Sequence, residues 1–505
     1  MSDSPTVPSS HDDDERLVPA DVIAPGQLPP MRYRDLPEPI PLRKMIGPSI
    51  MLAGLALGSG EFILWPYITY QSQFIFFWAC ILGVFTQYFI NMEITRWSLA
   101  TGESAITGFA RLSRHWAWVF LILNIVPWMV PAWSKGAAQM LGWMMWGDNL
   151  NDTTITMFSI AGLMGCGVIL TAGKVVYETV EKIQMFLVSF AMILVLLLAC
   201  WLVRSDAIVA QVNGIFRGGF PELTEQLTPA LLLGALAFAG VGGTLNLGQS
   251  NYVKDKGYGM GHYIGRITSP ITGQKEAISE VGYHFPHTPE NLARWRSWWR
   301  AANLEHVLTF LLTCLVSLVL LTLISYCLFY DKSGAPIPDA GQYAKGIDFV
   351  WGEAVEIERA FGSWVKFLFM IMGMAFLLTT EFGVLDASTR VSTDIVKVNW
   401  LRNNSVWTES RLYYTFLWGI IGIGTAILLY GMEEIGAFAL FKFAAAMNGG
   451  VMFLYCITLL VLNRFKLPPA LRMSWPRLLI MIWAVLFFGF FALWTFWDIL
   501  KGYFQ

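Results

Sequence analysis

The feature that most constrains this chain is a series of long apolar runs between residues 46 and 499. An α-helix needs about 20 apolar residues to cross the hydrocarbon core of a bilayer. Backbone groups find no hydrogen-bonding partner in lipid, so helices are the elements expected there. The composition agrees, because 55% of the residues are hydrophobic and only 14% are charged. We therefore predict an all-α, polytopic membrane protein.

The runs predict about eleven transmembrane helices. Lys and Arg gather before the first span and in every second loop after it, while the other loops are acidic or mixed. The positive-inside rule then places the N-terminus in the cytoplasm and the C-terminus outside, in the inner membrane if the cell is bacterial. The predicted spans cover 46–70, 74–98, 116–146, 154–172, 183–203, 229–248, 306–330, 364–385, 412–430, 436–462 and 476–499.

The first span has a centre that is poor helix material. Gly58, Ser59, Gly60 and Glu61 interrupt an apolar run that extends from residue 47 to residue 70. Each glycine weakens a helix by roughly 1 kcal/mol relative to alanine. A carboxylate in the hydrocarbon is costly unless it faces protein, water or a substrate. We predict a discontinuous helix whose free backbone groups and Glu61 bind a substrate, the alternative being a kinked structural helix.

The sixth span has a similar interruption. Gly240, Gly242 and Gly243 cluster at its middle, and Asn246 follows. Two broken helices that lie five spans apart are expected in a five-plus-five inverted repeat, where both breaks meet at the substrate. The alternative is a pair of unrelated glycine-rich packing helices. The repeat predicts a first half at 45–205 and a second half at 228–465, which includes a cytoplasmic loop at 250–305. A disordered cytosolic tail at 1–44 and the last span at 475–505 flank this core.

Several segments resemble the Nramp (natural resistance-associated macrophage protein) divalent-metal transporters. Residues 47–62, GPSIMLAGLALGSGEF, are similar to that family's first span, in which GP and a short apolar run precede D-P-G-N. TGESAITGFARL at 101–112 resembles its TG-x-x-LA segment, and 175–194 resembles its fifth span. The resemblance covers most of 45–465. It implies a leucine-transporter-like fold, alternating access and proton-linked transport of a divalent metal.

The metal-binding motifs of that family are missing. Gly58 to Glu61 replace D-P-G-N, and Gly243, Thr244 and Leu245 stand at the position of M-P-H in the sixth span. A soft thioether ligand helps to select transition metals, so manganese or iron selectivity has no evident basis here. The oxygen ligands that remain are Glu61, Asn246 and exposed carbonyls. They suit a hard cation such as Mg²⁺.

A second resemblance points to an organic substrate. GSGEF at 58–62 looks like the GSGIF of amino-acid/polyamine/organocation transporters, and LAFAGVGG at 236–243 looks like the FAFxGFE of their sixth span. This similarity implies backbone amides at 58–61 that hold a carboxylate, with a small organic zwitterion or carboxylate as substrate. An ion channel is the alternative of another class, and it would require a continuous pore.

Other polar residues inside the spans are candidates for coupling and gating. They are Lys135, Glu381, Asp386, Lys442 and Asn448. A buried lysine needs a counter-charge, and Glu381 and Glu61 are the natural ones. Asp386 and Arg390 lie four residues apart, the spacing of a local helix pair. The alternative is that these groups form structural salt bridges and helix contacts.

Other classes of function lack support. No P-loop motif, nucleophile–base set or cysteine spacing typical of metal sites occurs, so we predict neither an enzyme nor a cofactor. The net charge of −2 gives no reason to expect nucleic acid. The expected partners are an ion or small-molecule substrate and the lipid bilayer, with the protein as a monomer.

Overall fold

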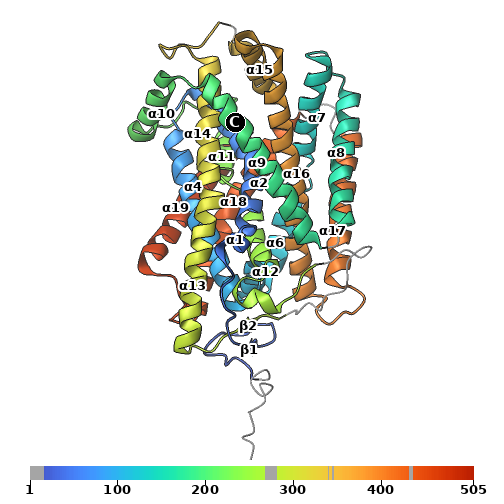
Figure 1. The fold of residues 1–505 in the computed structure, drawn as a ribbon, viewed down its shortest axis with the longest axis vertical. Helices are drawn as coiled ribbons and strands as arrows, with labels where there is room; N and C mark the ends of the chain where they lie inside the picture. The colour runs from blue at the N-terminus through green and yellow to red at the C-terminus, as the bar shows by residue number, and fades with distance from the viewer. Residues whose placement is uncertain are drawn as a thin grey trace, which may run out of the picture.

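The computed structural model describes residues 16–173, 175–267, 281–338, 340–343, 346–431 and 436–504. The described helices form one bundle that runs along the long axis of the molecule (Figure 1). Within these residues, ten helices are long and apolar enough to span a membrane, and the sixth span is divided into two shorter helices. The predicted all-α, polytopic architecture is confirmed.

The first five spans contain these elements: α2 (Pro48–Ala56), η2 (Leu57–Leu64) and α3 (Trp65–Ser72) in span one; α4 (Phe77–Thr101) in span two; α6 (His115–Trp128) and α7 (Ala132–Trp146) in span three; α8 (Asp152–Ala172) in span four; and α9 (Val176–Leu202) in span five. Short helices lie outside these spans: α1 (Leu42–Met45), α5 (Ala105–Leu112) and α10 (Ser205–Arg217).

The remaining spans contain α11 (Pro229–Ala237) and α12 (Leu245–Asp255) in span six; α13 (Pro289–His306), η4 (Val307–Leu311) and α14 (Leu312–Phe329) in span seven; α16 (Ser363–Asn399) in span eight; α17 (Glu409–Ala426) and η6 (Ile427–Gly431) in span nine; α18 (Ala437–Val461) and η7 (Leu462–Lys466) in span ten; and α19 (Trp475–Phe504) in span eleven. The connecting elements are η3 (Gly259–Tyr263), η5 (Ala340–Tyr343) and α15 (Asp348–Phe361).

Side-chain caps fix where several helices begin. In each case an Ncap oxygen accepts a hydrogen bond from a free backbone N–H of the first turn, which such groups need at a helix start. The capping residues are Ser104, Asn151, Thr228, Thr288 and Thr408. Asn151, Thr228 and Thr408 begin helices within three residues of the predicted starts at 154, 229 and 412, whereas Ser104 and Thr288 begin helices in predicted loops.

Span one differs from the prediction of a discontinuous helix. The backbone is helical without interruption from Pro48 to Ser72, and it adopts π-helical winding over Leu57–Leu64. The glycines therefore widen the helix locally instead of ending it, as π-bulges do at many functional sites. The prediction of a break in span one is wrong.

Span seven is longer than predicted. Residues 289–305, which we expected within a cytoplasmic loop, form the first part of a helix that extends from Pro289 to Phe329. Its Ncap is Thr288, whose hydroxyl accepts from the backbone N–H of Asn291 at 3.2 Å. Hydropathy places only the apolar second half of this helix in the membrane.

The predicted disordered tail is ordered from residue 16 onward, and residues 1–15 lie outside the described residues. Its strand β1 (Arg32–Tyr33) pairs in parallel with β2 (Tyr283–His284), with Tyr33 opposite His284. The indole of Trp298 donates to the carbonyl of Pro37 at 2.8 Å. Residues 16–44 therefore pack against the loop between spans six and seven.

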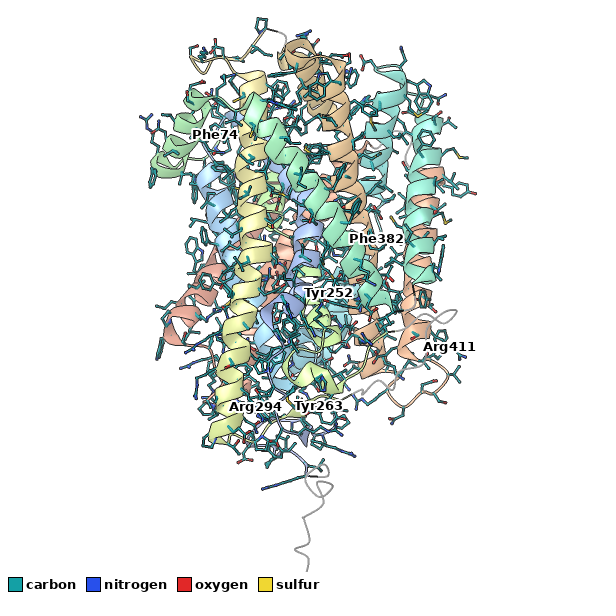
Figure 2. The ribbon with its side chains drawn as sticks, in the orientation of Figure 1. Phe74, Tyr252, Tyr263, Arg294, Phe382 and Arg411 are labelled. Atoms are coloured by element: carbon teal, nitrogen blue, oxygen red, sulfur yellow. The ribbon has the colours of Figure 1, made fainter. Side chains whose placement is uncertain are left out.

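The loops divide between two ends of the bundle. Figure 1 shows β1 and β2 at one end and α10 and α15 at the other. Figure 2 places Arg294 and Tyr263 at the β1–β2 end and Phe74 toward the opposite end. This alternation is the one that the charge pattern predicts, with the basic loops at the β1–β2 end. The orientation in the membrane stays a prediction.

Burial separates central helices from peripheral ones. The most apolar window of span one is 94% buried within the protein, whereas those of spans four and five are only 33% and 39% buried. Exposed apolar side chains on spans four and five, such as Met157 and Phe186, are then available to lipid. Span one therefore lies inside the bundle, where it can contact a substrate site.

The β1–β2 end offers a test through His284. Its ring is buried and its Nδ1 lies 3.1 Å from the carbonyl oxygen of Ala100. Burial disfavours the imidazolium and lowers the pKa of His284 to about 4. The unfolded chain, with a histidine pKa of about 6.5, binds more protons than the folded one between about pH 6.5 and 4.

We therefore predict that lowering the pH through this window reduces the unfolding free energy by up to about 3 kcal/mol, whereas the contribution is complete above pH ~6.5. Thermal unfolding of His284→Gln should show a weaker loss of stability between pH 7 and pH 4.5 than the wild type. His262→Gln, at an exposed position, is the control. Equal pH dependence in wild type and His284→Gln would contradict this prediction.

Candidate functional site

The break in span six is the centre of the candidate site. Between α11 and α12, residues 238–244 leave the helical conformation. Gly240, Gly242 and Gly243 have φ angles of +134°, +82° and +58°. Residues that carry a side chain rarely adopt such φ angles, so glycine permits this backbone conformation. The predicted interruption of span six is confirmed.

Side chains from spans one and two satisfy the free carbonyls at the end of α11. The indole Nε1 of Trp65 donates to Ala235 O at 2.9 Å. The amide Nε2 of Gln87, on α4, donates to Leu236 O at 3.2 Å and to Ala237 O at 2.6 Å. Without water, unpaired carbonyls at a helix end would be costly. These two residues therefore allow the helix to stop inside the protein.

The other side of the Gln87 amide contacts the unwound segment itself. Its Oε1 accepts from Val241 N at 3.1 Å and from Asn246 Nδ2 at 3.4 Å. A Cβ added at Gly240 would lie 2.6 Å from the same oxygen. One buried side chain thus bridges α11, the break and α12. Its sequence position in span two carried no sign of this role.

Polar groups of spans three and ten contact the far part of the break. Trp128 Nε1 donates to the Thr244 hydroxyl at 2.8 Å, and Asn246 Nδ2 donates to Tyr455 OH at 2.9 Å. Asn448 lies close to Gly243, because a Cβ added at Gly243 would lie 1.7 Å from the Oδ1 of Asn448. The Oδ1 atoms of Asn246 and Asn448 are buried and have no hydrogen-bond partner among the described residues. They are two acceptors available to a ligand.

Aromatic rings surround this segment. Trp128 and Trp133 lie with ring centroids 5.5 Å apart, and Phe238 lies 6.0 Å from the first and 6.3 Å from the second. Phe441 of α18 makes an edge contact with Trp133 at 5.4 Å. The break therefore combines neutral polar groups with aromatic surface.

Span one approaches the break closely through its glycines. A Cβ at Gly60 would lie 1.5 Å from the carbonyl oxygen of Phe238, so only glycine fits there. The N–H of Gly58 donates to the hydroxyl of Thr380 on α16 at 2.9 Å and is not free to hold a carboxylate. The side chain of Ser59 lies outside what the structure describes. These glycines serve close packing against span six.

Glu61 is fully buried but faces away from Asn246. The hydroxyl of Ser317, on α14, donates to its Oε2, and Cys80 and Cys314 lie nearby. In the part of the chain that the structure describes, its Oε1 has no hydrogen-bond partner. Asn246 instead contacts Gln87 and Tyr455. The two predicted metal ligands therefore do not meet in this conformation, and the described residues contain no group of three or more His, Cys, Asp or Glu that could hold a metal ion.

The predicted lysine pairs are not formed. Lys135 is partly exposed and lies near Asp152 of α8, whereas Glu381 accepts a hydrogen bond from the backbone N–H of Ser134 at 3.0 Å. Lys442 is also partly exposed. The sequence placed both lysines in apolar runs, but each lies on a helix face that hydropathy alone cannot identify.

Asp386 belongs to a buried ion-pair network at the β1–β2 end of the bundle. Arg390 Nε lies 2.9 Å from both of its carboxylate oxygens, which confirms the predicted local pair. Tyr413 OH donates to the same carboxylate at 2.7 Å. Arg390 also pairs with Asp255, the last residue of α12. The network therefore connects α16 to the second half of span six.

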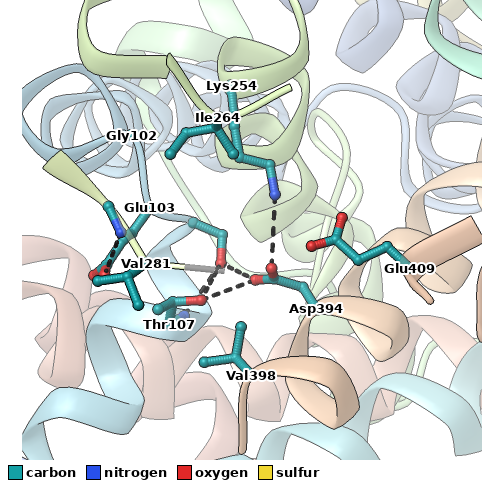
Figure 3. A pocket seen from close by; sticks show the side chains of 11 residues that line it. Gly102, Glu103, Thr107, Lys254, Ile264, Val281, Asp394, Val398 and Glu409 are labelled. Carbon is teal, nitrogen blue, oxygen red and sulfur yellow. Dashed lines mark hydrogen bonds and ion pairs between the residues drawn. The ribbon is translucent and has the colours of Figure 1, made fainter. Parts of the chain in front are cut away.

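A second polar cluster, drawn in Figure 3, lies beside this network. Lys254 of α12 points toward Asp394 of α16, with 3.6 Å between Nζ and Oδ1. The hydroxyls of Ser104 and Thr107, both on the α5 segment, donate to the same carboxylate. Together the two clusters hold α12 against α5 and α16. Sequence alone does not reveal these clusters, because their members lie up to 290 residues apart.

Comparison with solved structures supports the leucine-transporter-like fold. A histidine-to-alanine variant of the manganese transporter of Eremococcus coleocola aligns with a TM-score of 0.65 at 12% identity, over 93% of this chain and 91% of that chain. Its complex with an aromatic bis-isothiourea substituted compound aligns with a TM-score of 0.61 at 13% identity, over 93% and 90%. MhsT in complex with L-phenylalanine aligns with a TM-score of 0.50 at 13% identity, over 88% and 98%.

No protein-family model and no curated protein matches the sequence. At identities this low, the structural likeness concerns the fold alone. The predicted resemblance to the divalent-metal transporters therefore holds at the level of the fold. The local chemistry at the break has to be judged from the residues of this chain.

The contact between spans one and six yields a test. Gly60→Ala should lower the thermal unfolding temperature strongly, because the new methyl group meets the Phe238 carbonyl, which is backbone and cannot move aside cheaply. We expect a loss of roughly 1–3 kcal/mol or more. Gly450→Ala on α18, where an added Cβ meets nothing within 4 Å, is the matched control. Equal stability of the two variants would show that spans one and six pack less closely at Gly60 than described.

Proposed function

We propose that this chain is a secondary transporter that moves a small solute by alternating access around the break in span six. The observation that supports this most is the unwound segment at 238–244, held inside the bundle by Gln87 and Trp128 beside two unpartnered amide oxygens. Broken helices expose backbone groups to substrates in transporters of this kind. The fold shared with a manganese transporter and with MhsT agrees with this proposal.

The chemistry of the break favours a small organic zwitterion as the substrate. Its described polar groups are neutral: the amides of Gln87, Asn246 and Asn448 and the hydroxyls of Thr244 and Tyr455. A bare divalent cation would leave its charge uncompensated among such groups, since buried ions need charged ligands or water. An ammonium group instead donates hydrogen bonds to the two free amide oxygens and gains cation–π stabilisation from nearby rings.

The carboxylate of such a substrate has a matching position at the start of α12. The N-terminus of a helix offers a positive dipole end to anions. At α12 the N–H groups of Asn246 and Leu247 donate to Gly243 O and Thr244 O at 3.3 and 3.0 Å, so the dipole is the main attraction. Trp128 and Asn448 flank that start through Thr244 and Gly243. This position replaces the amides of 58–61 that the sequence suggested, which belong to a continuous helix. MhsT was crystallised with an amino acid, L-phenylalanine, which suits a zwitterion on this fold.

A proton-linked divalent-cation transporter is the second candidate, and the fold of the manganese transporter favours it. Its site would combine the oxygens of Asn246 and Asn448 with Glu61. The carboxylate of Glu61 would have to rotate away from Ser317 to reach them. A hard cation such as Mg²⁺ then fits better than Mn²⁺ or Fe²⁺, because the described ligands are all oxygen.

Thermal-shift screening of the purified protein separates these candidates. We expect one or more amino-acid zwitterions to raise the unfolding temperature, since a ligand at 100 times its Kd adds about 2.7 kcal/mol. Asn448→Leu should abolish the shift, while Asn399→Leu, at the end of α16 and away from the break, should retain it. The same ligand should enter proteoliposomes that contain the wild type.

Two other results have clear meanings. Stabilisation and uptake of Mg²⁺ or Mn²⁺, with no effect of any zwitterion, would favour the cation candidate and overturn the organic one. A protein that neither binds nor transports any of these solutes would contradict the proposed function.

A further inference from the structure

Three buried carboxyl groups lie along the contact between spans one and seven. Glu305 and Glu61 are 2% and 0% exposed, and Glu353 of α15 is 3% exposed. Each lies beside a hydroxyl: Glu305 beside Ser49 and Thr309, Glu61 beside Ser317, and Glu353 beside Ser325. The break in span six does not use these groups. We call this line of residues the helix one–seven seam.

The two helices of the seam run in the same direction and meet at three levels. Ser49 N donates to Glu305 Oε1 at 3.3 Å near the β1–β2 end. Glu61 meets Ser317 at the middle. Ser325 donates to the carbonyl of Pro66 at 3.2 Å near the other end. The number of residues between the first two levels is the same on both helices, since Ser49 and Glu61 are as far apart in the sequence as Glu305 and Ser317.

The levels extend over the thickness of a membrane. A helix rises 1.5 Å per residue, so the 20 residues from Glu305 to Ser325 cover about 30 Å. The hydrocarbon core of a bilayer is also about 30 Å thick. Protonatable groups are therefore distributed from one side of the core to the other along one helix contact.

None of the three carboxyls forms an ion pair with any residue in the described ranges. Tyr177, Tyr258 and His306 lie near Glu305, and Cys80 and Cys314 lie near Glu61. The nearest charges on the Glu305 side are Glu181 and Lys256 beside Tyr177, and these two pair with each other. A buried carboxyl group without a cation holds a proton instead of a charge. Outside the spans, burial raises the pKa of Glu353 to about 8.

Other buried carboxylates of the same protein provide the contrast. Glu93 binds Arg96 and Arg477, and Glu103 binds Arg111 through two hydrogen bonds of 2.8 and 2.5 Å. These are structural ion pairs, in which each charge is compensated. The acids of the seam lack such cationic partners, and within the described residues Glu61 Oε1, Glu353 Oε1 and His306 Nε2 are buried without a hydrogen-bond partner of normal geometry. Ionisable groups inside a membrane mark functional sites, and proton relays are one class of these sites.

We propose that the helix one–seven seam conducts protons through Glu305, Glu61 and Glu353, on a route separate from the substrate break. This route rests on the proposed function in one respect: its protons are the ion that couples to solute transport. In each step a carboxylic acid releases its proton to water, and the next carboxylate in line takes up a proton. Successive levels are about 18 and 12 Å apart along the helix, so proton transfer between them requires water molecules to enter the seam.

Infrared difference spectroscopy against pH tests whether these groups hold protons, without any substrate. We expect a carboxylic C=O band of the purified wild type to disappear in each of Glu305→Gln, Glu61→Gln and Glu353→Gln. Ser317→Ala keeps the Glu61 carboxyl and should shift its band. Glu103→Gln should remove no such band, because its carboxylate is paired with Arg111. A seam variant that loses no band overturns the proposal for that residue.

Proton flux tests whether the groups act in series. Proteoliposomes loaded with a pH-sensitive dye and given a potassium diffusion potential should acidify with the wild type. Each seam variant should slow this flux roughly tenfold or more, and double variants should be no slower, as expected for one relay. A wild type without flux, or variants that retain it, overturns the proposal. Both assays omit substrate, so failure of the proposed transport function leaves their outcome interpretable.

Discussion

The structure depends on how one interrupted helix is satisfied inside a membrane protein. Every backbone group without a partner in the hydrocarbon costs several kcal/mol. Span six gives up its helical hydrogen bonds between α11 and α12, and Gln87 replaces part of them with three contacts to backbone groups. Trp65 of span one satisfies a further carbonyl, and Trp128 of span three holds the side chain of Thr244. The break is possible because neighbouring helices provide these donors and acceptors.

This arrangement gives span one a supporting role at the break. Its glycines allow the helix to pass against Phe238, and its π-helical turn places Glu61 on the opposite side, toward span seven. Spans one and six therefore contribute differently. Span six presents backbone and amide groups to a solute, while span one separates that site from the seam of carboxyl groups. A transporter with this layout would move solute and protons through neighbouring but distinct parts of the bundle.

Much of the fold could be predicted from the sequence. Long apolar runs located most spans within several residues, but the helix of span seven begins 17 residues before the predicted start and that of span eight ends 14 residues after the predicted end. Three clustered glycines with Asn246 located the break in span six. The predicted break in span one was wrong because Gly58 and Gly60 permit either a broken helix or a close helix contact, and the sequence does not distinguish the two. Gln87 and Trp128 were not recognised, since their partners lie more than 100 residues away. Lys135 and Lys442 needed coordinates to show which face they occupy.

Hydrogen exchange at residues 238–244 tests the central interaction most directly. The account predicts that Gln87→Ala speeds amide exchange in this segment by roughly tenfold, because Val241 N loses its acceptor and a buried hydrogen bond contributes about 1 kcal/mol or more. Thr86→Ala, the neighbouring position on α4, should leave it unchanged. Exchange in the wild type as slow as in the middle of α11, and unaffected by Gln87→Ala, would show that span six is an ordinary helix and would contradict the account.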